Sequence, residues 1–415
     1  MREASFRLRN GLSVLGGFSG TETSRYQRDP NKHETILSGD LKGDDGPGFA
    51  NNDENSYHVV TAHGAVHKTV LDGITITAGN ANQPDGYEYS SGGGMYIAAG
   101  NQTLIDCTFR HNSATLGGGM YKSAGNCTLA NCTFLGNNAV IDGGGLWKRN
   151  EGNLEVTNCT FIDNLARGDG GGLHCRDSGS PVLTNCIFIG NMAGQEGGGM
   201  DHLGPTGAIL TNCRFVRNSA SHAGGMCTKG PFHPNPILLN CTFSGNVSAG
   251  FAGGMSNNGS EPMLVNCTFA GNKAGRGGGA MSNNFAAPVL TNCIIWGNTG
   301  EGNNVKDSQI PGETLTVNYC CIQGWSDKLG GVGNFGDDPL FVDPDGPDNR
   351  IGTEDDNLRL KPGSPCINAG DNAAIPADTY DLDDDGDPKE LVPFDIEGKS
   401  RIINGIVDIG AYESG

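Results

Sequence analysis

The sequence is poor in positive charge and in long apolar segments. Its 27 Lys and Arg residues face 46 Asp and Glu residues, giving a formal net charge of −19. Phosphate binding needs a basic surface, so this balance argues against nucleic acid and anionic membranes as partners. No stretch approaches the roughly 18 consecutive apolar residues of a transmembrane helix. The start, "REASFRLRNG", has no apolar core of the kind found in a signal peptide.

Motifs for metal binding and helical periodicity are also missing. There is no CxxC pair, so we expect no zinc site, and no HExxH supports a metal bound by the histidines. No segment carries apolar residues at i, i+3, i+4 and i+7 over the length that a helix requires. An all-helical solenoid is therefore excluded.

What the sequence has is a repeat, marked by cysteines. Successive cysteines of the series are separated by 25, 27, 27, 27, 28, 26, 26 and 27 residues. An Asn or Asp precedes most of them, a second Asn follows five residues later, and glycine runs end in Met or Leu. A fixed period of roughly 20–50 residues is typical of a solenoid. The series is Cys107, Cys132, Cys159, Cys186, Cys213, Cys241, Cys267, Cys293 and Cys320.

Each repeat predicts one coil of a β-helix with three short strands. The strands are Gly-Gly-Gly-Met-x-x, x-Leu-x and Cys-Thr-Phe-x-Gly, with Asn at the bends because Asn tolerates left-handed backbone. Stacked coils lie about 4.8 Å apart, so equivalent residues form ladders. Cys, Phe, Leu and Met fill the interior, and the Asn columns hydrogen-bond from coil to coil. The predicted fold is an all-β, right-handed parallel β-helix with coils of about 27 residues.

The cysteines leave two alternatives open. Stacked cysteines have Cα separations compatible with disulfides, but an inward column serves equally well as a stack of small buried apolar groups. We expect mostly free thiols, with the adjacent Cys320 and Cys321 as a candidate bonded pair.

The "NCTF…GN…GGGM" repeats resemble the polymorphic outer-membrane-protein repeats of pectin-lyase-like right-handed β-helices. Flanking segments, among them "SFRLRNGLSVLGGFSG" (5–20), "DPLFVDPDG" (338–346), "GSPCINAGDN" (363–372) and "DIGAYES" (408–414), resemble bacterial choice-of-anchor Q domain proteins. The resemblance implies a secreted or cell-surface protein, and further strand-rich sequence before "SFRLRNG". We expect irregular coils at 1–91, regular repeats at 92–334 and an Asp-rich capping segment at 335–415.

Two acidic loops in the C-terminal segment are candidate calcium sites. Asp-x-Asp-x-Asp-Gly begins at Asp381 and matches the start of a calcium loop, although Val392 stands where a bidentate Glu is expected. Clustered carboxylates repel one another unless a cation is bound; the alternative is a solvated acidic loop. The role of calcium would be structural. The candidate ligands are Asp343, Asp345, Asp348, Asp355 and Asp356, and Asp381, Asp383, Asp385 and Asp387.

The residue after the inward Met or Leu forms a candidate ligand face. Strand alternation directs this column outward, and aromatic rings beside cations suit sugars and acidic glycans. The alternative is that outer ladders only stabilise the sheet. The expected face consists of Tyr96, Tyr121, Trp147, Lys148, His174 and Arg176.

A carboxylate column precedes the glycines at Asp142, Asp169 and Glu196. Carboxylates one coil apart could bind calcium or share a proton, but we interpret the column as a solvated turn. The resemblance implies carbohydrate-active enzymes among similar folds, yet the repeats contain neither an "NTD" triplet nor an "RxK" motif of those enzymes.

Two functions follow from these observations. The first is a non-catalytic secreted or surface module, serving as a rigid structural, adhesion or polysaccharide-contacting element. The second is a polysaccharide lyase or glycoside hydrolase working on the outer face. Fold alone does not assign activity, and the absence of a local catalytic motif favours the first.

Overall fold

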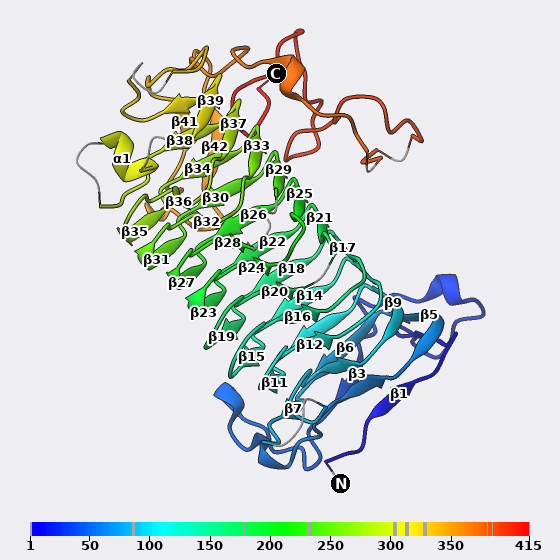
Figure 1. Cartoon of the computed structure of the whole chain (residues 1–415). Coiled ribbons are helices and arrows are strands. Elements are labelled where there is room, and N and C mark those ends of the chain that lie inside the picture. Colours follow the sequence, from blue (N-terminus) through cyan, green and yellow to red (C-terminus); the bar gives the residue numbers. More distant parts are fainter. Residues whose placement is uncertain are drawn as a thin grey trace. The chain divides into compact units, whose positions relative to one another are not determined.

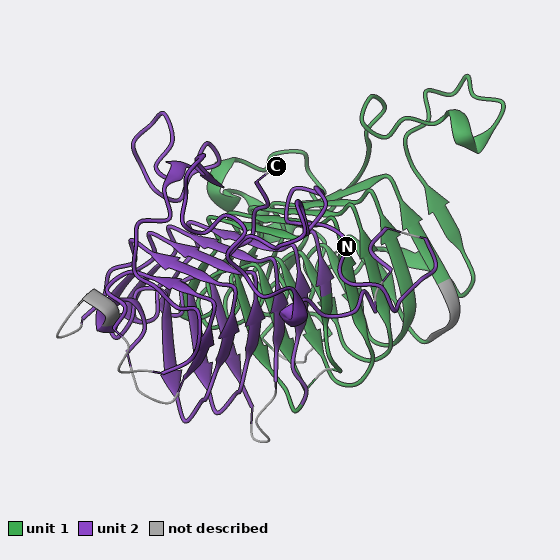
Figure 2. Ribbon diagram, turned by 90° about the horizontal axis from the view of Figure 1, so that it is seen from above, with its two compact units in different colours: residues 1–182, 186–205 green, residues 183–185, 206–415 purple. Residues whose placement is uncertain are grey.

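The computed structural model describes residues 2–84, 88–177, 179–230, 235–301, 305–311, 315–326, 330–379, 381–383 and 385–414. The chain divides into two compact units, and each is described by itself (Figures 1 and 2). The first unit comprises residues 1–182 and 186–205, and the second comprises 183–185 and 206–415. Strand β21 (Val182–Thr184) contains the boundary between them.

In the first unit, strands recur in four series, and strands of one series pair in parallel from coil to coil. Series 1 is β1 (Phe6–Leu8), β4 (Val60–Ala62), β8 (Met95–Ile97), β12 (Met120–Lys122), β16 (Leu146–Arg149), β20 (Leu173–Arg176) and β24 (Met200–Leu203). Series 2 is β2 (Ser13–Leu15), β5 (Ala65–Asp72), β9 (Gly100–Ile105), β13 (Cys127–Ala130) and β17 (Leu154–Thr157). Series 3 is β3 (Thr35–Ser38), β6 (Ile74–Thr77), β10 (Thr108–Arg110), β14 (Thr133–Leu135), β18 (Thr160–Ile162) and β22 (Ile187–Ile189). Series 4 is β7 (Asn80–Ala81), β11 (Ser113–Ala114), β15 (Asn138–Ala139), β19 (Leu165–Ala166) and β23 (Met192–Glu196).

The second unit repeats the same four series. Series 1 is β28 (Met226–Lys229), β32 (Met255–Asn258) and β36 (Met281–Asn284). Series 2 is β25 (Ile209–Thr211), β29 (Ile237–Leu239), β33 (Met263–Val265), β37 (Val289–Thr291) and β39 (Thr316–Asn318). Series 3 is β26 (Arg214–Val216), β30 (Thr242–Ser244), β34 (Thr268–Ala270), β38 (Ile294–Trp296) and β40 (Cys321–Ile322), and series 4 is β27 (Ser219–His222), β31 (Val247–Phe251) and β35 (Lys273–Arg276).

A few elements stand outside the series. Strands β41 (Phe341–Asp343) and β42 (Asn357–Leu360) pair antiparallel in the C-terminal segment. The helices are short: α1 (Val305–Gln309), and the 3-10 turns η1 (Arg25–Gln27), η2 (Pro47–Phe49), η3 (Asn52–Glu54) and η5 (Asn372–Ala374). Within the described ranges, no helix has the length and hydropathy needed to cross a membrane.

The predicted parallel β-helix is confirmed, and so are its interior ladders. Phe109, Phe134, Phe161 and Phe188 stack with ring centroids 4.7–4.8 Å apart, all fully buried. All fourteen cysteines are buried and carry free thiols. Most coils also have a fourth strand, which the sequence analysis did not predict; in β7, β11, β15 and β19 it is only two residues long, too short to show alternation.

Two asparagine columns hold the bends, as the repeat predicts. The residues of the column before the cysteines have a left-handed backbone conformation; Asn131 and Asn158 have φ of 54° and 53°. The second column is fully buried: Asn137 donates through Nδ2 to Asn164 Oδ1 at 2.9 Å, and Asn164 donates to Asn191 Oδ1 at the same distance. These amides also bind backbone groups where the chain turns, so buried polar atoms of the backbone stay paired.

The last coil is covered at two strand edges. Gly279 N and Ala280 N donate to the carbonyls of Ser308 and Gln309 in α1. Gln309 also ends the buried amide ladder, because its Oε1 accepts Asn298 Nδ2 at 2.8 Å. Along series 3, Ile322 N donates to Phe335 O at 2.9 Å. Pairing of this kind removes exposed strand edges that invite aggregation.

Beyond residue 335, the C-terminal segment lies back along the coils of the second unit. Its Cys366, Ile409 and Ala411 pack with Ile294 and Cys321 in one buried cluster. The bend asparagines bind it directly: Asn266 donates to Asp408 O at 2.9 Å, and Asn292 donates to Asp371 O at 3.0 Å. The segment is therefore held along the asparagine bends as well as at the end of the last coil.

Candidate functional site

The outward column of series 1 forms a continuous ladder in the first unit. Its members are in register from β8 to β24. The rings of Tyr96 and Tyr121 are 5.5 Å apart, those of Tyr121 and Trp147 are 5.0 Å apart, and those of Trp147 and His174 are 6.0 Å apart. Asp201 follows His174 in register. The structure thus brings together four of the six residues that the sequence proposes for a ligand face.

This ladder is covered, although it lies on the outer side of its strands. Tyr121 is 4% exposed, Trp147 3% and His174 2%. The glycine turn of each coil lies directly against it: a β-carbon on Gly143 would lie 2.7 Å from that of Trp147, and one on Gly170 would lie 2.6 Å from that of His174. Both glycines also have positive φ, of 67° and 64°, a conformation that other residues rarely adopt. The glycine turn therefore packs closely against the base of the ladder side chains.

A pocket of about 420 Å³ opens beside Trp147. Arg149 places its guanidinium carbon 5.8 Å from the centre of the Trp147 ring. Arg176 is half exposed and also lines the pocket. The lining residues combine one indole, two guanidinium groups and one carboxylate with apolar and hydroxyl side chains: Pro84, Ser90, Thr115, Leu116, Ile141, Asp142, Trp147, Arg149 and Arg176.

Lys148 does not belong to this face, contrary to the sequence prediction. It is fully buried, and its Nζ donates to the carbonyls of Ser123, Arg149, Asn150 and Glu151 at 2.7–3.2 Å. Alternation from the outward Trp147 makes its neighbour point inward, a signal that the sequence already contains. Burial lowers the pKa of Lys148.

Lys122 lies one coil before Lys148 in the same inward column. It is fully buried as well, and its Nζ donates to Gly100 O at 2.6 Å and to Ala124 O at 2.5 Å. Burial lowers the pKa of Lys122 to about 8. The two lysines therefore bind backbone carbonyls at the bend that follows series 1.

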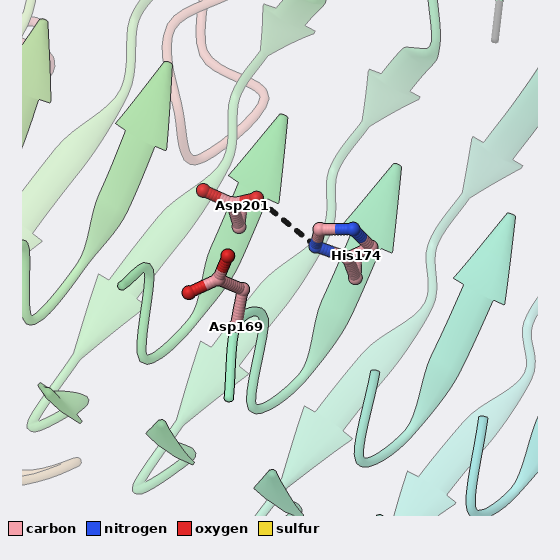
Figure 3. Close-up of side chains that lie close together, drawn as sticks. All are labelled: Asp169, His174 and Asp201. Carbon is pink, nitrogen blue, oxygen red and sulfur yellow. Dashed lines mark ion pairs between the residues drawn. The ribbon is translucent and has the colours of Figure 1, made fainter. Parts of the chain in front are cut away.

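The carboxylate column before the glycines is ordered from coil to coil. Asp169 N donates to Asp142 Oδ1 at 2.9 Å, and Glu196 N donates to Asp169 Oδ1 at 3.0 Å. Asp169 also meets the ladder: one oxygen of Asp169, one nitrogen of His174 and one oxygen of Asp201 lie within 4.8 Å of one another (Figure 3). Asp201 is fully buried; the proposed face included neither Asp169 nor Asp201, although Asp201 is the next member of the outward column.

The two acidic loops differ in what the structure brings together. Asp381, Asp383 and Asp385 each offer an oxygen within 4.8 Å of the others. Asp387 accepts the backbone N–H of Lys389 instead. Partial desolvation and the nearby charges of Asp383 and Asp385 raise the pKa of Glu390, which fits a crowded acidic loop.

In the loop at 343–356, carboxylates accept hydrogen bonds from residues of the same loop. Asp348 Oδ1 accepts Arg350 N at 2.8 Å, Asp356 Oδ2 accepts Gly352 N at 2.6 Å, and Asp355 accepts the Thr353 hydroxyl. Asp343 and Asp345 accept backbone N–H groups through their carbonyls. Among the residues that the structure describes, no three carboxylates of this loop converge.

A third acidic group, which the sequence analysis did not single out, lies in the N-terminal region. Asp40, Asp44, Asp45 and Glu54 place ligand atoms within 4.8 Å of one another. Asp44 and Asp45 are adjacent in "GDLKGDDGPG", so acidic density was the available signal; Glu54 is brought in only by the fold.

Comparison with known proteins identifies the fold family. The family model described as "Right handed beta helix region" matches residues 53–200 and 172–333. A search of curated proteins gave no significant match. The two matched ranges span most of the chain and contain every coil of the regular repeat, together with the ladder and the pocket. The chain belongs to the right-handed β-helix family, as a pectin-lyase-like β-helix repeat protein.

Proposed function

We propose that the protein is a non-catalytic, secreted or cell-surface β-helix module that binds acidic polysaccharide at the pocket beside Trp147. The observation that carries this proposal is the pairing of Arg149 and Arg176 around an indole in a chain of net charge −19. The nearly buried Trp147 contributes apolar surface to the pocket wall, and guanidinium groups bind carboxylates through paired hydrogen bonds.

The resemblance of the flanking segments to choice-of-anchor Q domain proteins supports a surface location. The stacked coils suit such a role mechanically, because each coil is fixed by backbone hydrogen bonds to its neighbours. A rigid repeat can present one binding pocket at a fixed place without any moving part. Adhesion or retention of extracellular glycan would follow from that placement.

The first test is binding of a charged and a neutral sugar. Titration calorimetry should show binding of oligouronides and at least tenfold weaker binding of the same oligosaccharides as methyl esters, because each charge-assisted hydrogen bond contributes more than about 1.4 kcal/mol. Arg176→Gln should weaken the oligouronide tenfold. Arg167→Gln is the matched control, because Arg167 is exposed in the same unit and does not line the pocket. Equal affinity of both variants would reject the pocket as the binding site.

The alternative function is a polysaccharide lyase or glycoside hydrolase. The observation in its favour is the cluster of Asp169 with His174 and Asp201, the last two of which continue the ladder that contains Trp147. Carboxylates and imidazole are the usual general acids and bases of such enzymes. Incubation with the bound oligouronide distinguishes the two functions: new chain ends that disappear in Asp169→Asn would establish the enzyme, and an intact ligand would establish the binding module.

We also propose a structural calcium ion in the loop of Asp381, Asp383 and Asp385. Three converging carboxylate oxygens and an internal glycine support it, since Ca²⁺ takes carboxylate and carbonyl oxygens. Calcium would neutralise the repulsion within the loop.

Removal of one ligand tests the calcium proposal. Asp383→Asn should abolish one equivalent of Ca²⁺ binding in equilibrium dialysis. Asp345→Asn, from the loop whose carboxylates do not converge, should leave that equivalent in place. Loss in both variants, or in neither, would contradict the assignment.

A further inference from the structure

The ladder ends beside three side chains of types that can ligate a metal, from neighbouring coils. His174 lies on β20, Asp201 is its partner in register on β24, and Asp169 lies in the turn that precedes β20 (Figure 3). One ligand atom of each lies within 4.8 Å of the others. The His174 side chain is 2% exposed and that of Asp201 0%, so both are shielded from bulk water.

The contact between His174 and Asp201 does not have the geometry of a hydrogen bond. Nδ1 lies 3.0 Å from Asp201 Oδ2, yet neither ring nitrogen of His174 has a hydrogen-bond partner. Buried imidazoles are almost always hydrogen-bonded, so this ring calls for an explanation. His174 Nδ1 and Asp201 Oδ2 are therefore close together without a hydrogen bond between them. Two ligand atoms of one bound cation have this arrangement.

We propose that Asp169, His174 and Asp201 bind one divalent transition-metal ion, for which Zn²⁺ is the best match. One imidazole and two carboxylates form a nitrogen–oxygen donor set that Zn²⁺ accepts. Ca²⁺ prefers oxygen ligands alone, so this site differs in chemistry from the acidic loop at 381–385. The proposal does not rest on glycan binding, but its three residues are the ones that the alternative catalytic function would use.

Neighbouring groups already orient one of the three ligands. Asp169 Oδ1 accepts the backbone N–H of Glu196 at 3.0 Å, which restrains the orientation of the carboxylate. The turn that carries Asp169 is itself anchored, because Asp169 N donates to Asp142 Oδ1 at 2.9 Å. Such outer hydrogen bonds are what hold metal ligands in position in proteins.

Cobalt provides the direct test, because Co²⁺ replaces Zn²⁺ in such sites and absorbs visible light. Protein freed of metal with a chelator should bind one equivalent of Co²⁺ with a new absorption band, and one equivalent of Zn²⁺ should remove the band. His174→Gln should weaken Co²⁺ at least tenfold. His111→Gln is the control, since His111 is exposed and lies outside the group.

A second variant guards against a folding failure in His174→Gln. Asp169 is only partly buried, so Asp169→Asn should keep the native circular dichroism spectrum and still lose at least tenfold in Co²⁺ affinity. Zn²⁺ should raise the melting temperature of the unaltered protein and leave that of Asp169→Asn unchanged. Absence of saturable Co²⁺ binding, or equal affinity in the unaltered protein and Asp169→Asn, would overturn the proposal.

Discussion

Asn164→Leu should lower the free energy of unfolding by on the order of 4 kcal/mol and weaken the contacts among three neighbouring coils. Asn164 Oδ1 accepts both N and Nδ2 of Asn137, at 3.1 and 2.9 Å, and its own Nδ2 donates to Phe134 O and to Asn191 Oδ1. Leucine has similar volume but no polar atom, so several fully buried donors and acceptors lose their partners. The urea midpoint measures the loss.

A second bend asparagine of the same coil supplies the control. Asn158 is exposed and left-handed, with φ of 53°, so Asn158→Gly keeps the bend and should cost less than about 1 kcal/mol. Hydrogen exchange at the backbone amide of Asn137 should accelerate in Asn164→Leu and not in Asn158→Gly, because only the first removes its acceptor. Similar urea midpoints for the two variants would show that the buried amide ladder is not what holds the coils.

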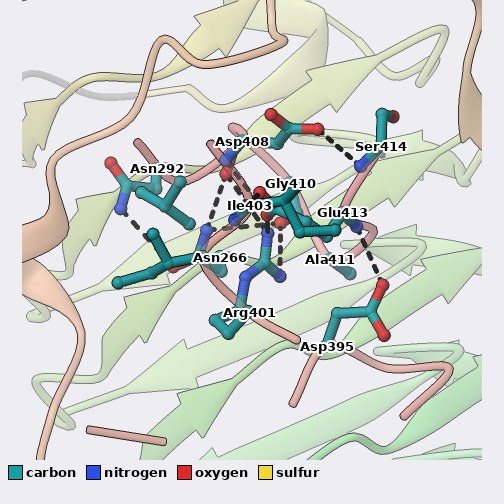
Figure 4. Close-up of polar contacts among 12 residues, drawn as sticks. Asn266, Asn292, Asp395, Arg401, Ile403, Asp408, Gly410, Ala411, Glu413 and Ser414 are labelled. Carbon is teal, nitrogen blue, oxygen red and sulfur yellow. Dashed lines mark hydrogen bonds and ion pairs between the residues drawn. The ribbon is translucent and has the colours of Figure 1, made fainter. Parts of the chain in front are cut away.

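Arg401→Met should detach the C-terminal segment from the coils and lower the free energy of unfolding by about 3–5 kcal/mol. Arg401 is 1% exposed and donates to Glu413 Oε2 at 2.8 Å (Figure 4). It also donates to Asn240 Oδ1 at 3.3 Å. Its removal leaves the carboxylate of Glu413 buried without a cation. Limited proteolysis should cut residues 395–414 in Arg401→Met long before it cuts the repeats.

The double variant Arg401→Met, Glu413→Gln separates the charge from the packing. It removes both members of the buried Arg401–Glu413 pair, so it should recover part of the stability lost in Arg401→Met. If the double variant is cut as fast as the single one, the buried ion pair is not what anchors the segment.

The loss in Arg401→Met should also depend on pH. Burial raises the pKa of Glu413 to about 7, above its unfolded value of 4.5. The folded state therefore binds the proton more tightly, and its stabilising contribution is complete below pH 4.5 and lost as pH rises through about 7. Arg401 holds this pKa down, so its removal should be less costly at pH 5 than at pH 8. A cost that does not change with pH would contradict the role of the buried carboxylate.

Much of the fold could be predicted because equivalent residues stack on themselves. The spacing of the cysteines gave the coil, and left-handed Asn131 and the buried Phe109 and Phe134 lie where the repeat places them. Each position meets a near-copy of itself about 4.8 Å away, so one repeat contains the contacts of all the others. The candidate ligand face was predicted in part: alternation placed Trp147 and His174 in one column, but the same rule, followed one residue further, turns Lys148 inward.

The sequence by itself determined the period of the β-helix, the asparagine bends and the columns of side chains inside it. Only the tertiary structure decided that glycine turns pack against Trp147 and His174, that Asp169 joins His174 and Asp201, and that Arg401 pairs with Glu413 along the bends. The physical reason is that a repeat specifies contacts between like positions. Contacts between a turn and a ladder, or between a non-repeating segment and the coils, join unlike positions that no period in the sequence relates.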